Sequence, residues 1–536
     1  MHRIARLAIP ALAILVVGVI GGSAATPSQS PTKQDIAKKI LNSPAGKHLT
    51  SPARAYMESV ARNDHRLAPD SNGLVTKGKK VTSGKPGGGG SLANVRVNNP
   101  ADDSHQTDQT TQSETAIAVS GSHVVVGYND SQNVLQPFLT AGANLTGVAY
   151  SSDGGQTFTD GGALPNAPGN VNLGDPWLAV DSAGTFYFSN LTIDATTGFL
   201  LVGVSRSTDG GKTWTPAASI PAPAGAFFYS ADKDALTTGP GNGNLYDVWD
   251  DFSLDPNFNA VSGLPVAHST DGGQTWTVTY ASQVPLFGSG CSFSQYIGAQ
   301  PLVSGGTVYD VAELISVDDP NCTGAPETFS QAVFVSHDGG STWSAGAVIP
   351  VTPSAQFGAF NLGPAQFMRN LEFPTLAAFK GNVYLAWNDG GDGSGHSHIK
   401  LAQLDSGGGV VGNPSFITSG TNDEAQPALT ADSSLHVAYY QISTGANGNG
   451  MLDAFVGNSQ NGNSWKAQRV TSQSFPGVFT FPQFDPVIAF GYMGDYIAAT
   501  SDGSHQYFAW GDNRDIVTNF LWPSGRNDPD VFFAKQ

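Results

Sequence analysis

One eight-residue pattern occurs four times in this chain and constrains the fold more than any other feature of the sequence. The copies share a Ser, an Asp, a Gly pair, a Thr and a final aromatic residue, and they span residues 151–158, 207–214, 269–276 and 336–343. A degenerate copy, one residue shorter, spans 459–465. In such a segment the Asp accepts hydrogen bonds from turn amides, and paired glycines permit positive φ angles. The pattern therefore predicts the same tight turn in a series of similar structural units.

A second repeat lies about 35 residues before each turn and has the composition of a pair of short β-strands. Seven such pairs follow one another at intervals of roughly 55–67 residues: 113–119 with 124–130, 174–180 with 185–190, 232–236 with 244–252, 299–303 with 307–313, 372–376 with 382–389, 425–429 with 435–440, and 494–498 with 506–512. This period and content predict an all-β propeller of four-stranded blades. Seven blades is the preferred count, and six is the alternative if one unit is irregular.

The two ends of the repeat region predict how the propeller closes. The last unit ends with one strand, residues 530–534, and lacks an outer fourth strand of its own. Residues 93–98 resemble the fourth strands elsewhere. We therefore expect the N-terminal strand to complete the last blade, which removes open sheet edges.

The composition excludes several other classes of protein. The chain has 65 Gly and 33 Pro in 536 residues, 40% hydrophobic residues and only 13% charged residues. A disordered chain would hold fewer apolar residues, and a helical bundle more charged ones. Residues 101–536 carry 11 Lys and Arg against 39 Asp and Glu. A body this acidic repels phosphate backbones, so we expect no nucleic-acid partner.

The N-terminal end has the pattern of a secretory signal. A basic start precedes the apolar residues 7–20, and Ser23-Ala24-Ala25 fits a cleavage site, so residues 1–25 are predicted to be a signal peptide. No later segment is apolar enough to span a membrane. We expect a secreted monomer, located outside the cell, in the periplasm or at the cell surface.

Residues 26–90 differ from the repeat region that follows at 91–536. Residues 34–63 are weakly amphipathic and predict one or two short helices. Residues 84–90 (GKPGGGG) form a flexible linker. A pro-segment, a spacer from the cell surface and a disordered tail are all compatible with this region. The only two cysteines, Cys291 and Cys322, predict one disulfide, with two unpaired thiols as the alternative.

The repeated turn resembles the Asp-box, or BNR, repeat of sialidases and related β-propellers. In that family the box joins the third and fourth strands of a blade, on the face opposite the active site. The resemblance implies that loops entering the first strands, and loops joining second to third strands, form the opposite face. We call this the upper face, and we expect any site to lie there.

The predicted upper face collects acidic and aromatic residues. Its central mouth receives, from successive first strands, Glu114, Asp175, Asp232, Gln300, Glu372, Gln426 and Asp495; second strands end in Asp130, Asp250, Asp251, Asp389 and Asp512, next to Tyr128, Trp249, Trp387 and Trp510. Sugar rings stack on aromatic side chains, and carboxylates bond hydroxyls or act as acids and bases. The alternative is that these aromatics pack between blades and that the polar mouth holds only water.

The sequence does not contain the residue pattern on which sialidase catalysis depends. The family clamps its substrate carboxylate with three arginines from separate blades and uses a Tyr nucleophile with a Glu and an Asp. Here only Arg369, Arg514 and Arg526 are predicted to reach upper loops, and the last two share one loop. The Arg-Ile-Pro signature of sialidase catalytic domains is also absent. An acidic mouth would repel sialic acid, so we do not expect sialidase activity.

Metal binding has weak support in the sequence. His396 and His398 lie near Asp389 and Asp392, but two solvated histidines in a Gly-rich loop explain the pattern better. The run from Asp389 to Gly393 is compatible with a structural Ca²⁺, although it lacks the EF-hand spacing. No metal ligand and no other cofactor is assigned.

Three functional hypotheses remain open. The preferred one is a propeller that binds a glycan, or a cell-surface or extracellular protein, without sialidase chemistry. Its candidate ligand-binding residues are Glu114, Asp232, Asp250, Asp389, Asp512, Trp387, Trp510, Arg369 and Arg514. The second is a glycoside hydrolase or lyase, with Glu372, Asp175 and Asp495 as catalytic candidates. The third is a surface scaffold tethered by its N-terminal segment.

Overall fold

The computed structural model describes most of the chain. The described residues are 31–63, 80–81, 92–100, 111–131, 144–217, 219–254, 259–354, 358–363, 366–446, 448–479, 493–518 and 523–536. The predicted signal peptide and the Gly-rich linker lie outside these ranges.

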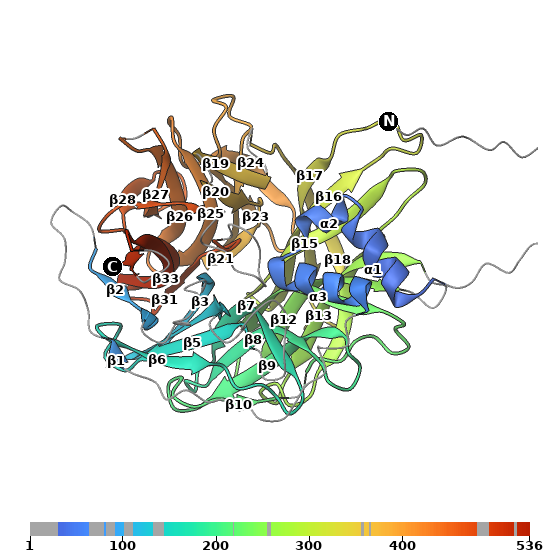
Figure 1. Cartoon of the computed structure of the whole chain (residues 1–536), viewed down its shortest axis with the longest axis horizontal. Coiled ribbons are helices and arrows are strands. Elements are labelled where there is room, and N and C mark those ends of the chain that lie inside the picture. Colours follow the sequence, from blue (N-terminus) through green and yellow to red (C-terminus); the bar gives the residue numbers. More distant parts are fainter. Residues whose placement is uncertain are drawn as a thin grey trace, which may run out of the picture.

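Antiparallel β-sheets make up the body of the molecule, as predicted (Figure 1). Within the described residues the strands form seven sheets, one of which has eight strands and joins two four-stranded halves through a parallel contact between β9 and β11. When that sheet is divided at this contact and a small three-stranded sheet is set aside, seven units remain, each of which runs outward from an innermost strand. Unit 1 contains β3 (Gln112–Ser120), β4 (His123–Asp130), β5 (Thr146–Ser151) and β6 (Phe158–Ala163), with β1 (Lys80–Val81) on its outer edge. Unit 2 contains β7 (Val171–Val180), β8 (Phe186–Ile193), β9 (Leu200–Ser207) and β10 (Thr215–Pro216). Unit 3 contains β11 (Tyr229–Thr238), β12 (Leu245–Leu254), β13 (Ala260–Ser269) and β14 (Thr277–Pro285).

The remaining units follow the same order. Unit 4 contains β15 (Phe293–Ser304), β16 (Thr307–Val317), β17 (Thr328–Ser336) and β18 (Ser344–Val351). Unit 5 contains β21 (Thr375–Phe379), β22 (Asn382–Asp389), β23 (His398–Leu404) and β24 (Val410–Phe416). Unit 6 contains β25 (Asp423–Ala431), β26 (Leu435–Thr444), β27 (Gly450–Ser459) and β28 (Lys466–Arg469), with β29 (Phe475–Pro476) paired to β27. Unit 7 contains β31 (Ala498–Ser501), β32 (Gln506–Val517), β33 (Arg526–Lys535) and β2 (Asn94–Arg96).

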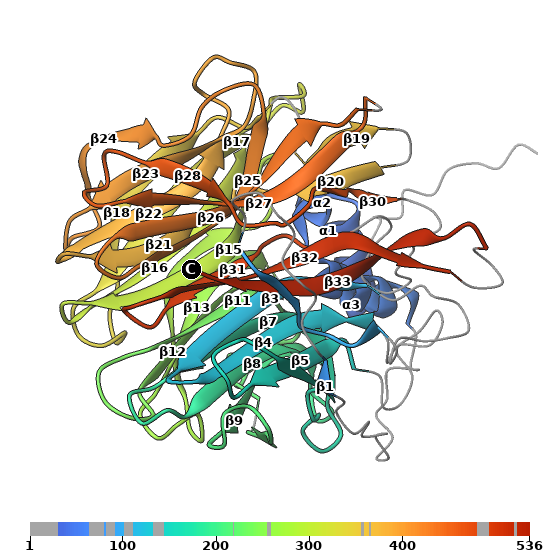
Figure 2. The same cartoon turned by 90° about the vertical axis from the view of Figure 1, so that its left-hand side faces the viewer.

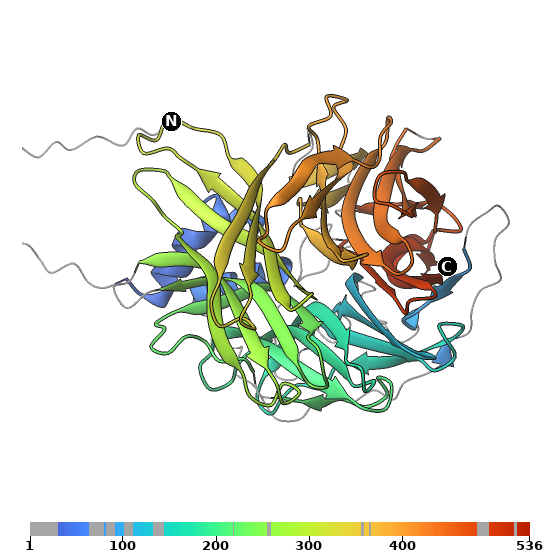
Figure 3. The same ribbon diagram turned by 180° about the vertical axis from the view of Figure 1, so that it is seen from behind.

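The units are arranged around a common centre (Figures 1 and 3). Each innermost strand contacts the innermost strand of the next unit, and β31 of unit 7 contacts β3 of unit 1. Burial falls from the centre outward: every residue of β12 is buried, whereas no residue of the outer strand β14 is. Apolar side chains therefore fill the spaces between neighbouring sheets.

The four repeated turns each join the third and fourth strands of a unit, as the resemblance implied. In unit 4, Asp338 accepts hydrogen bonds from Ser336 Oγ at 2.8 Å, Thr342 N at 2.9 Å and Thr342 Oγ1 at 2.6 Å. Asp153, Asp209 and Asp271 make the same set in the other three copies. The local chemistry read from the sequence is thus present in every full copy.

The N-terminal strand pairs with the last strand of the chain, as expected. In antiparallel register, Asn94 lies opposite Ala534, Val95 opposite Phe533 and Arg96 opposite Phe532. The Asn94 amide adds links to unit 6, because its Nδ2 donates to Val470 O at 2.9 Å and its Oδ1 accepts from Ser472 N at 2.7 Å. Strand β2 therefore lies on the outer edge of unit 7 and fastens it to unit 6.

Three further strands form a small sheet that was not predicted. β19 (Gly358–Gly363) pairs with β20 (Gln366–Asn370), and β20 pairs with β30 (Val478–Phe479). Because β30 lies more than 100 residues further along the chain, no local pattern announces this sheet. It places Arg369, on β20, beside the centre of the molecule.

Residues 31–63 form three helices, where one or two were predicted: α1 (Lys33–Leu41), α2 (Ala45–His48) and α3 (Ser51–Arg62). Thr32 caps α1 in a capping box with Asp35, and Thr50 is the N-cap of α3. The helices pack against one side of units 2–4 (Figure 2). Their buried residues Ile36, Ile40 and Met57 belong to the same apolar core as the strands beneath. No helix in the described ranges is long and apolar enough to cross a membrane.

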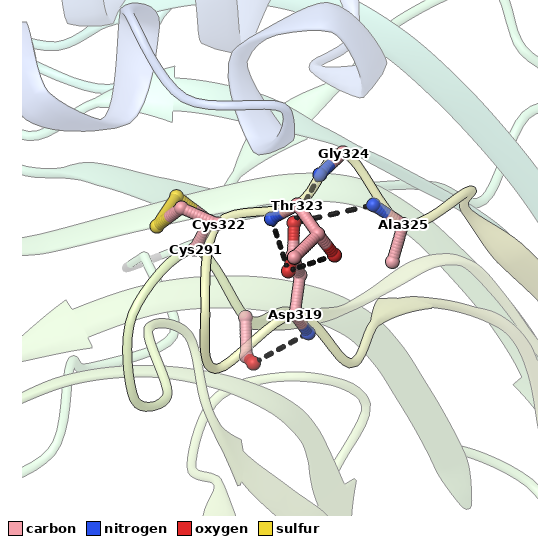
Figure 4. Close-up of a disulfide and its surroundings, with 7 residues drawn as sticks. Cys291, Asp319, Cys322, Thr323, Gly324 and Ala325 are labelled. Atoms are coloured by element: carbon pink, nitrogen blue, oxygen red, sulfur yellow. Dashed lines mark hydrogen bonds between the residues drawn. A yellow bond between two sulfur atoms is a disulfide. The ribbon is translucent and has the colours of Figure 1, made fainter.

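Cys291 and Cys322 form the predicted disulfide (Figure 4). It joins the loop before β15 to the loop after β16, both at the upper end of unit 4. Asp319 orders the second loop by accepting hydrogen bonds from Thr323 N at 2.7 Å and Gly324 N at 2.8 Å. The N-terminal helices lie beside these loops.

Candidate functional site

Five of the seven innermost strands have a two-residue bulge at the upper face. Their register shifts fall at Ser113/Ala116, Gly174/Trp177, Ala231/Asp234, Ile297/Gln300 and Ala425/Ala428. Glu114, Asp175 and Gln426 occupy the bulges with left-handed backbone, at φ of 50°, 53° and 53°. This conformation costs a non-glycine residue on the order of 1–2 kcal/mol. The surrounding structure holds acidic and amide side chains in place at that cost.

Four carboxyl groups form what we call the central acid cluster: Glu114, Asp175 and Asp232 from the bulges, and Asp495 from the segment before β31. Glu114 and Asp175 lie on either side of Asn129, which contacts the carboxylate of the first and the backbone amide of the second. Glu114 Oε1 also accepts from the Asp495 amide at 3.1 Å. Units 1, 2, 3 and 7 therefore contribute to one site, and the sequence-based expectation that these residues converge holds for this subset.

Asn129 and Gly174 position the pair. Asn129 Nδ2 donates to Glu114 Oε2 at 2.5 Å, and its Oδ1 accepts from the Asp175 amide at 2.8 Å. Gly174 precedes Asp175 at φ 95°, and a Cβ there would lie 2.3 Å from Asn129 Oδ1. Glycine is thus required for the close approach. Asn129 was not singled out in the sequence; its place next to the acidic end of β4 was the available signal.

Two cations accompany the cluster. Arg369 Nε lies 3.2 Å from Asp495 Oδ1. Lys233 is completely buried, with Nζ 4.3 Å from the ring centre of Trp177 and 4.2 Å from that of Tyr496. Lys233 Nζ also donates to Asp234 O at 2.9 Å. Two basic side chains thus accompany the four acidic ones at this site.

Burial shifts these carboxyl groups toward the protonated form. Desolvation, followed by repulsion from Asp175, raises the pKa of Asp232 to about 7. Desolvation raises the pKa of Asp495 to about 6, although Arg369 opposes the shift. The pKa of Glu114 rises well above its usual range because of desolvation and the neighbouring Asp175 and Asp495. The cluster therefore retains protons near neutral pH.

Glu372 lies in a different group. Desolvation, with repulsion from Glu313 and Asp389, raises its pKa well above the usual range. Its Oε1 accepts from Asn370 Nδ2 at 3.4 Å. The three catalytic candidates thus lie in two places. Asp175 and Asp495 belong to the central acid cluster, whereas Glu372 lies with Glu313 and Asp389 between units 4 and 5.

Gln300 and Gln426 also differ in place. Gln426 Nε2 donates to Gly494 O at 2.8 Å, next to the cluster. In unit 4 the left-handed bulge position is Gly298, at φ 72°, so Gln300 lies two residues further along β15. Both glutamines line a central cavity of about 390 Å³. Residues from the innermost strands of all seven units line this cavity, and Lys233 and Asp495 connect it to the cluster.

The acids at the ends of second strands are held mainly by their own units. Trp387 Nε1 donates to Asp389 Oδ2 at 3.1 Å, and Trp510 Nε1 donates to Asp512 Oδ2 at 2.8 Å. Both indoles are at most 1% exposed. They pack in the core, which was the alternative considered, and offer no face for stacking in this conformation. Asp250 differs, because Asp232 contributes to raising its pKa and it therefore borders the cluster.

Arg514 does not join Arg369. Its guanidinium binds Asp512, with Nε 2.9 Å from Oδ1, and reaches Asn94 and Ser472. These partners belong to units 6 and 7, and none is a member of the central acid cluster. The Arg526 side chain lies outside the described atoms. Among described residues, Arg369 is the one predicted upper-face arginine at the cluster.

The N-terminal helices cover the cluster. Thr50 N lies 3.3 and 3.2 Å from the two carboxylate oxygens of Asp232, and Thr50 Oγ1 also donates to Asp232. Arg369 Nη2 donates to His48 O at 3.1 Å and to Leu49 O at 2.8 Å. All four carboxyl groups are at most 1% exposed as a result of this cover and the surrounding strands.

The two histidine side chains of the loop lie close to carboxylates. His398 contacts Glu424, and its Nε2 lies 3.4 Å from Asp392; His396 Nδ1 lies 3.4 Å from Asp423. Asp389 is 3.2 Å from Lys400 Nζ. Within the described ranges, no group of three or more His, Cys, Asp or Glu side chains is placed to hold a metal ion. The carboxylates of the predicted Ca²⁺ loop thus face other partners.

Comparison with known proteins gives only distant similarity. No family model and no curated protein matches the chain. Among solved structures, an α-L-arabinofuranosidase of Fusarium graminearum in complex with an iminosugar inhibitor has 14% identity and a TM-score of 0.41, covering 69% of this chain and 98% of its own. An α-L-arabinanase of Penicillium chrysogenum complexed with arabinobiose has 12% identity and a TM-score of 0.38, covering 66% and 92%. A Dyadobacter fermentans protein of unknown function has 12% identity and a TM-score of 0.39, covering 83% and 97%. Similarity at this level assigns neither a family nor an activity.

Proposed function

We propose that the chain is a secreted β-propeller of seven blades, formed by residues 91–536 and closed by strand β2. Seven antiparallel units support this, with innermost strands that contact one another in sequence and again between β31 and β3. The cavity lined by all seven innermost strands is the central channel of such a propeller. Secretion rests on the signal pattern of residues 1–25.

The proposed function is the binding of a glycan at the centre of the upper face, without sialidase chemistry. The observation that carries it is the convergence of four buried carboxyl groups with Arg369 and Lys233. Thr50 demonstrates the kind of group this site accepts, since its hydroxyl donates to Asp232. A sugar hydroxyl would make the same hydrogen bond, and Arg369 would donate to sugar oxygens as it does to the Leu49 carbonyl.

Binding is better supported than hydrolysis by the geometry of the acids. Glycoside hydrolases separate their two carboxyl groups by about 5–5.5 Å for retention or about 6.5–9.5 Å for inversion. At the cluster, Asp495 instead lies 3.2 Å from Arg369 Nε and Asp232 accepts hydrogen bonds from Thr50, so both carboxyl groups are engaged with binding partners. One arginine at the cluster also falls short of the three that sialidases use.

A second candidate, a glycoside hydrolase or lyase, has one observation in its favour. Asp495 and Asp232 have pKa values raised to about 6 and about 7, and such groups hold and release protons near neutral pH. In that case Asp175 and Asp495 are the acids at the reacting centre, and Glu372 lies apart from it.

The test combines a binding assay with a search for product. The full chain, uncut or cut at a protease site introduced into residues 64–79, is incubated with sialylated glycoprotein and with neutral and acidic polysaccharides. We expect retained glycan, no released sugar in mass spectra, and loss of binding in Asp495→Asn. Asp318→Asn, which changes an exposed loop carboxylate, is the matched control. Release of sialic acid would contradict the proposal, and release of another sugar would establish the second candidate.

A further inference from the structure

The segment that covers the central acid cluster has the features of a bound ligand. We propose that residues 31–63, here called the cap, are a detachable intramolecular ligand of the upper face, and that the cap must leave the cluster before another ligand enters. The inference rests on the proposed function only for the identity of that competing ligand.

Polar groups at the tip of the cap contact the centre. Thr50 gives both its amide and its hydroxyl to Asp232, and Arg369 takes the carbonyls of His48 and Leu49. Helix α3 begins at Ser51, so its N-terminal end faces the Asp232 carboxylate. A helix N-terminus stabilises an anion through its free amides and its dipole. Thr50 thus supplies hydrogen-bond donors to the Asp232 carboxylate, and the cap carbonyls accept hydrogen bonds from Arg369. A polar ligand would make the same two kinds of contact.

The edge of the cap is held by contacts to single loops. His48 Nε2 lies 3.4 Å from Glu327, and Tyr56 donates to Gly198 O at 2.9 Å. Lys39 lies 4.1 Å from the Phe287 ring centre, beside the loop that Cys291 anchors. Each of these partners is at a loop of units 2 or 4, so the cap spans several blades and is not a strand of any of them.

Charge favours docking. Residues 31–63 carry six Lys and Arg against two Asp and Glu, a net charge of +4, whereas residues 101–536 carry −28. The basic cap thus screens an acidic surface. It is the most basic part of the described chain, and it is seated on the most acidic centre.

Burial of the acids opposes docking. The cluster carboxyls have raised pKa values because they are removed from water, and Asp250 Oδ2 has no hydrogen-bond partner among the described residues. Removal of charged groups from water costs free energy that is regained when the cap leaves. The buried apolar side chains Ile36, Ile40 and Met57 add to the terms that favour docking. Sixteen residues separate Asn63 from Lys80, where β1 pairs with β6. The cap is therefore held by a balance of opposing terms and joined to unit 1 by a connection of this length.

The experiment uses the full chain with a protease site introduced into residues 64–79, between the cap and strand β1, so that cleavage separates the cap from the strand that pairs with β6. After cleavage, a fluorescein-labelled synthetic peptide of residues 31–63 is added, and its exchange for the cleaved cap is followed by anisotropy. Three peptides are compared: wild type, Thr50→Val, and the control Lys38→Gln, whose side chain is exposed. Because the changes are made in the peptide, the folding of the propeller is the same in every measurement.

The Lys38→Gln peptide is expected to bind at most about twofold more weakly than wild type, because it loses one exposed, salt-screened charge and no contact to the cluster. The Thr50→Val peptide is expected to bind about 10- to 100-fold more weakly, as befits loss of a charge-assisted hydrogen bond. A cap that never exchanges, a Thr50→Val peptide that binds as well as wild type, or loss of the near-ultraviolet circular dichroism signal on cap release would each overturn the inference. Displacement of the bound peptide by a glycan from the panel supports both proposals. Exchange without displacement by any glycan leaves the cap inference standing and contradicts the proposed function.

Discussion

Asp271 illustrates how one side chain organises a turn. Its Oδ1 accepts from Gln274 N and Thr275 N, both at 2.9 Å, and its Oδ2 accepts from Thr275 Oγ1 at 2.6 Å. The bonds from Thr275 lower the pKa of Asp271 to about 2. The ionised carboxylate therefore contributes to stability above about pH 4, and the contribution is lost as pH falls toward 2.

Asp271→Asn is expected to lower the thermal midpoint at pH 7, because the amide keeps one acceptor but loses the charge and the second acceptor. The difference from wild type should narrow as pH falls from 4 to 2, where wild-type Asp271 becomes protonated. Differential scanning calorimetry at several pH values measures both effects. Asp318→Asn, an equal change of charge at an exposed position, should leave the midpoint unchanged. A difference in thermal midpoint between Asp271→Asn and wild type that stays constant from pH 4 to pH 2 would contradict the lowered pKa of Asp271.

Residue patterns predicted the turns but not which aromatic side chains are exposed. The turn is local: Ser, Asp and Thr lie within eight residues and determine the geometry by themselves. Exposure is not local. Trp387 and Trp510 stand beside carboxylates in the sequence as a sugar platform would, yet each indole donates to that carboxylate from inside the core. Packing between neighbouring units decides this, and the sequence of one unit does not contain it.

At the scale of elements, strand β2 is short but well connected. Asn94 links it to three positions: Val470 O, Ser472 N and Arg514 Nη1. Asn94→Ala is expected to destabilise the protein by roughly 1–3 kcal/mol, since it leaves part-buried polar groups without partners. Urea unfolding measures the change. Asn463→Ala, in an exposed turn, is the control and should have no effect. Equal stability of the two variants would show that β2 does not hold unit 7.

Element positions were predicted closely where the repeat operates and missed elsewhere. β3, β4, β32 and β33 lie where the paired patterns placed them. In unit 4 the match of Gln300-Pro301 to Gln426-Pro427 placed Gln300 at the start of the first strand, but Gly298 takes the left-handed position that Gln426 has in unit 6. The sheet containing β20 was missed since its partner β30 comes from a distant segment. Pairings between distant segments leave no periodic trace in the sequence.

At the scale of the whole molecule, many buried carboxyl groups make stability depend on pH. The pKa values of Asp232 and Asp251 are raised to about 7, and that of Glu313 to about 8, chiefly by burial. An acid whose pKa is raised by folding makes its full contribution to protein stability below about pH 4. That contribution is lost as pH rises through 7 to 8. We therefore expect the thermal midpoint to fall between pH 5 and pH 8.

The variant Asp232→Asn should reduce that fall, because the amide stays neutral throughout the range. Thermal midpoints of wild type and variant at half-unit steps from pH 5 to pH 8 provide the test. Asp194→Asn, which alters a half-exposed turn, is the control and should follow the wild-type profile. A wild-type midpoint that rises across the range would show that the buried acids remain ionised.

The sequence predicted which acidic residues form the candidate site, but not that other parts of the chain cover it. Glu114, Asp175, Asp232 and Asp495 were expected at one mouth because they recur at one position of the repeat. Neither the arginine that joins them nor the cover over them follows from the repeat, because Arg369 and Thr50 both lie outside it. What closes the site comes from the part of the chain that shares no pattern with the rest.

The pairing of β2 with β33 has a consequence for the order of events during synthesis. The cap and β2 leave the ribosome first, but the partner of β2 is the last strand made. The cap contacts units 2, 3 and 4 and the side chain of Arg369, and all of these innermost strands and Arg369 precede residue 370 in the sequence. Strand β33 begins at Arg526, more than 150 residues later. A nascent chain can thus cover Glu114, Asp175 and Asp232 before Asp495 and β33 have been made, so that unit 7 is completed on a molecule whose centre is already occupied.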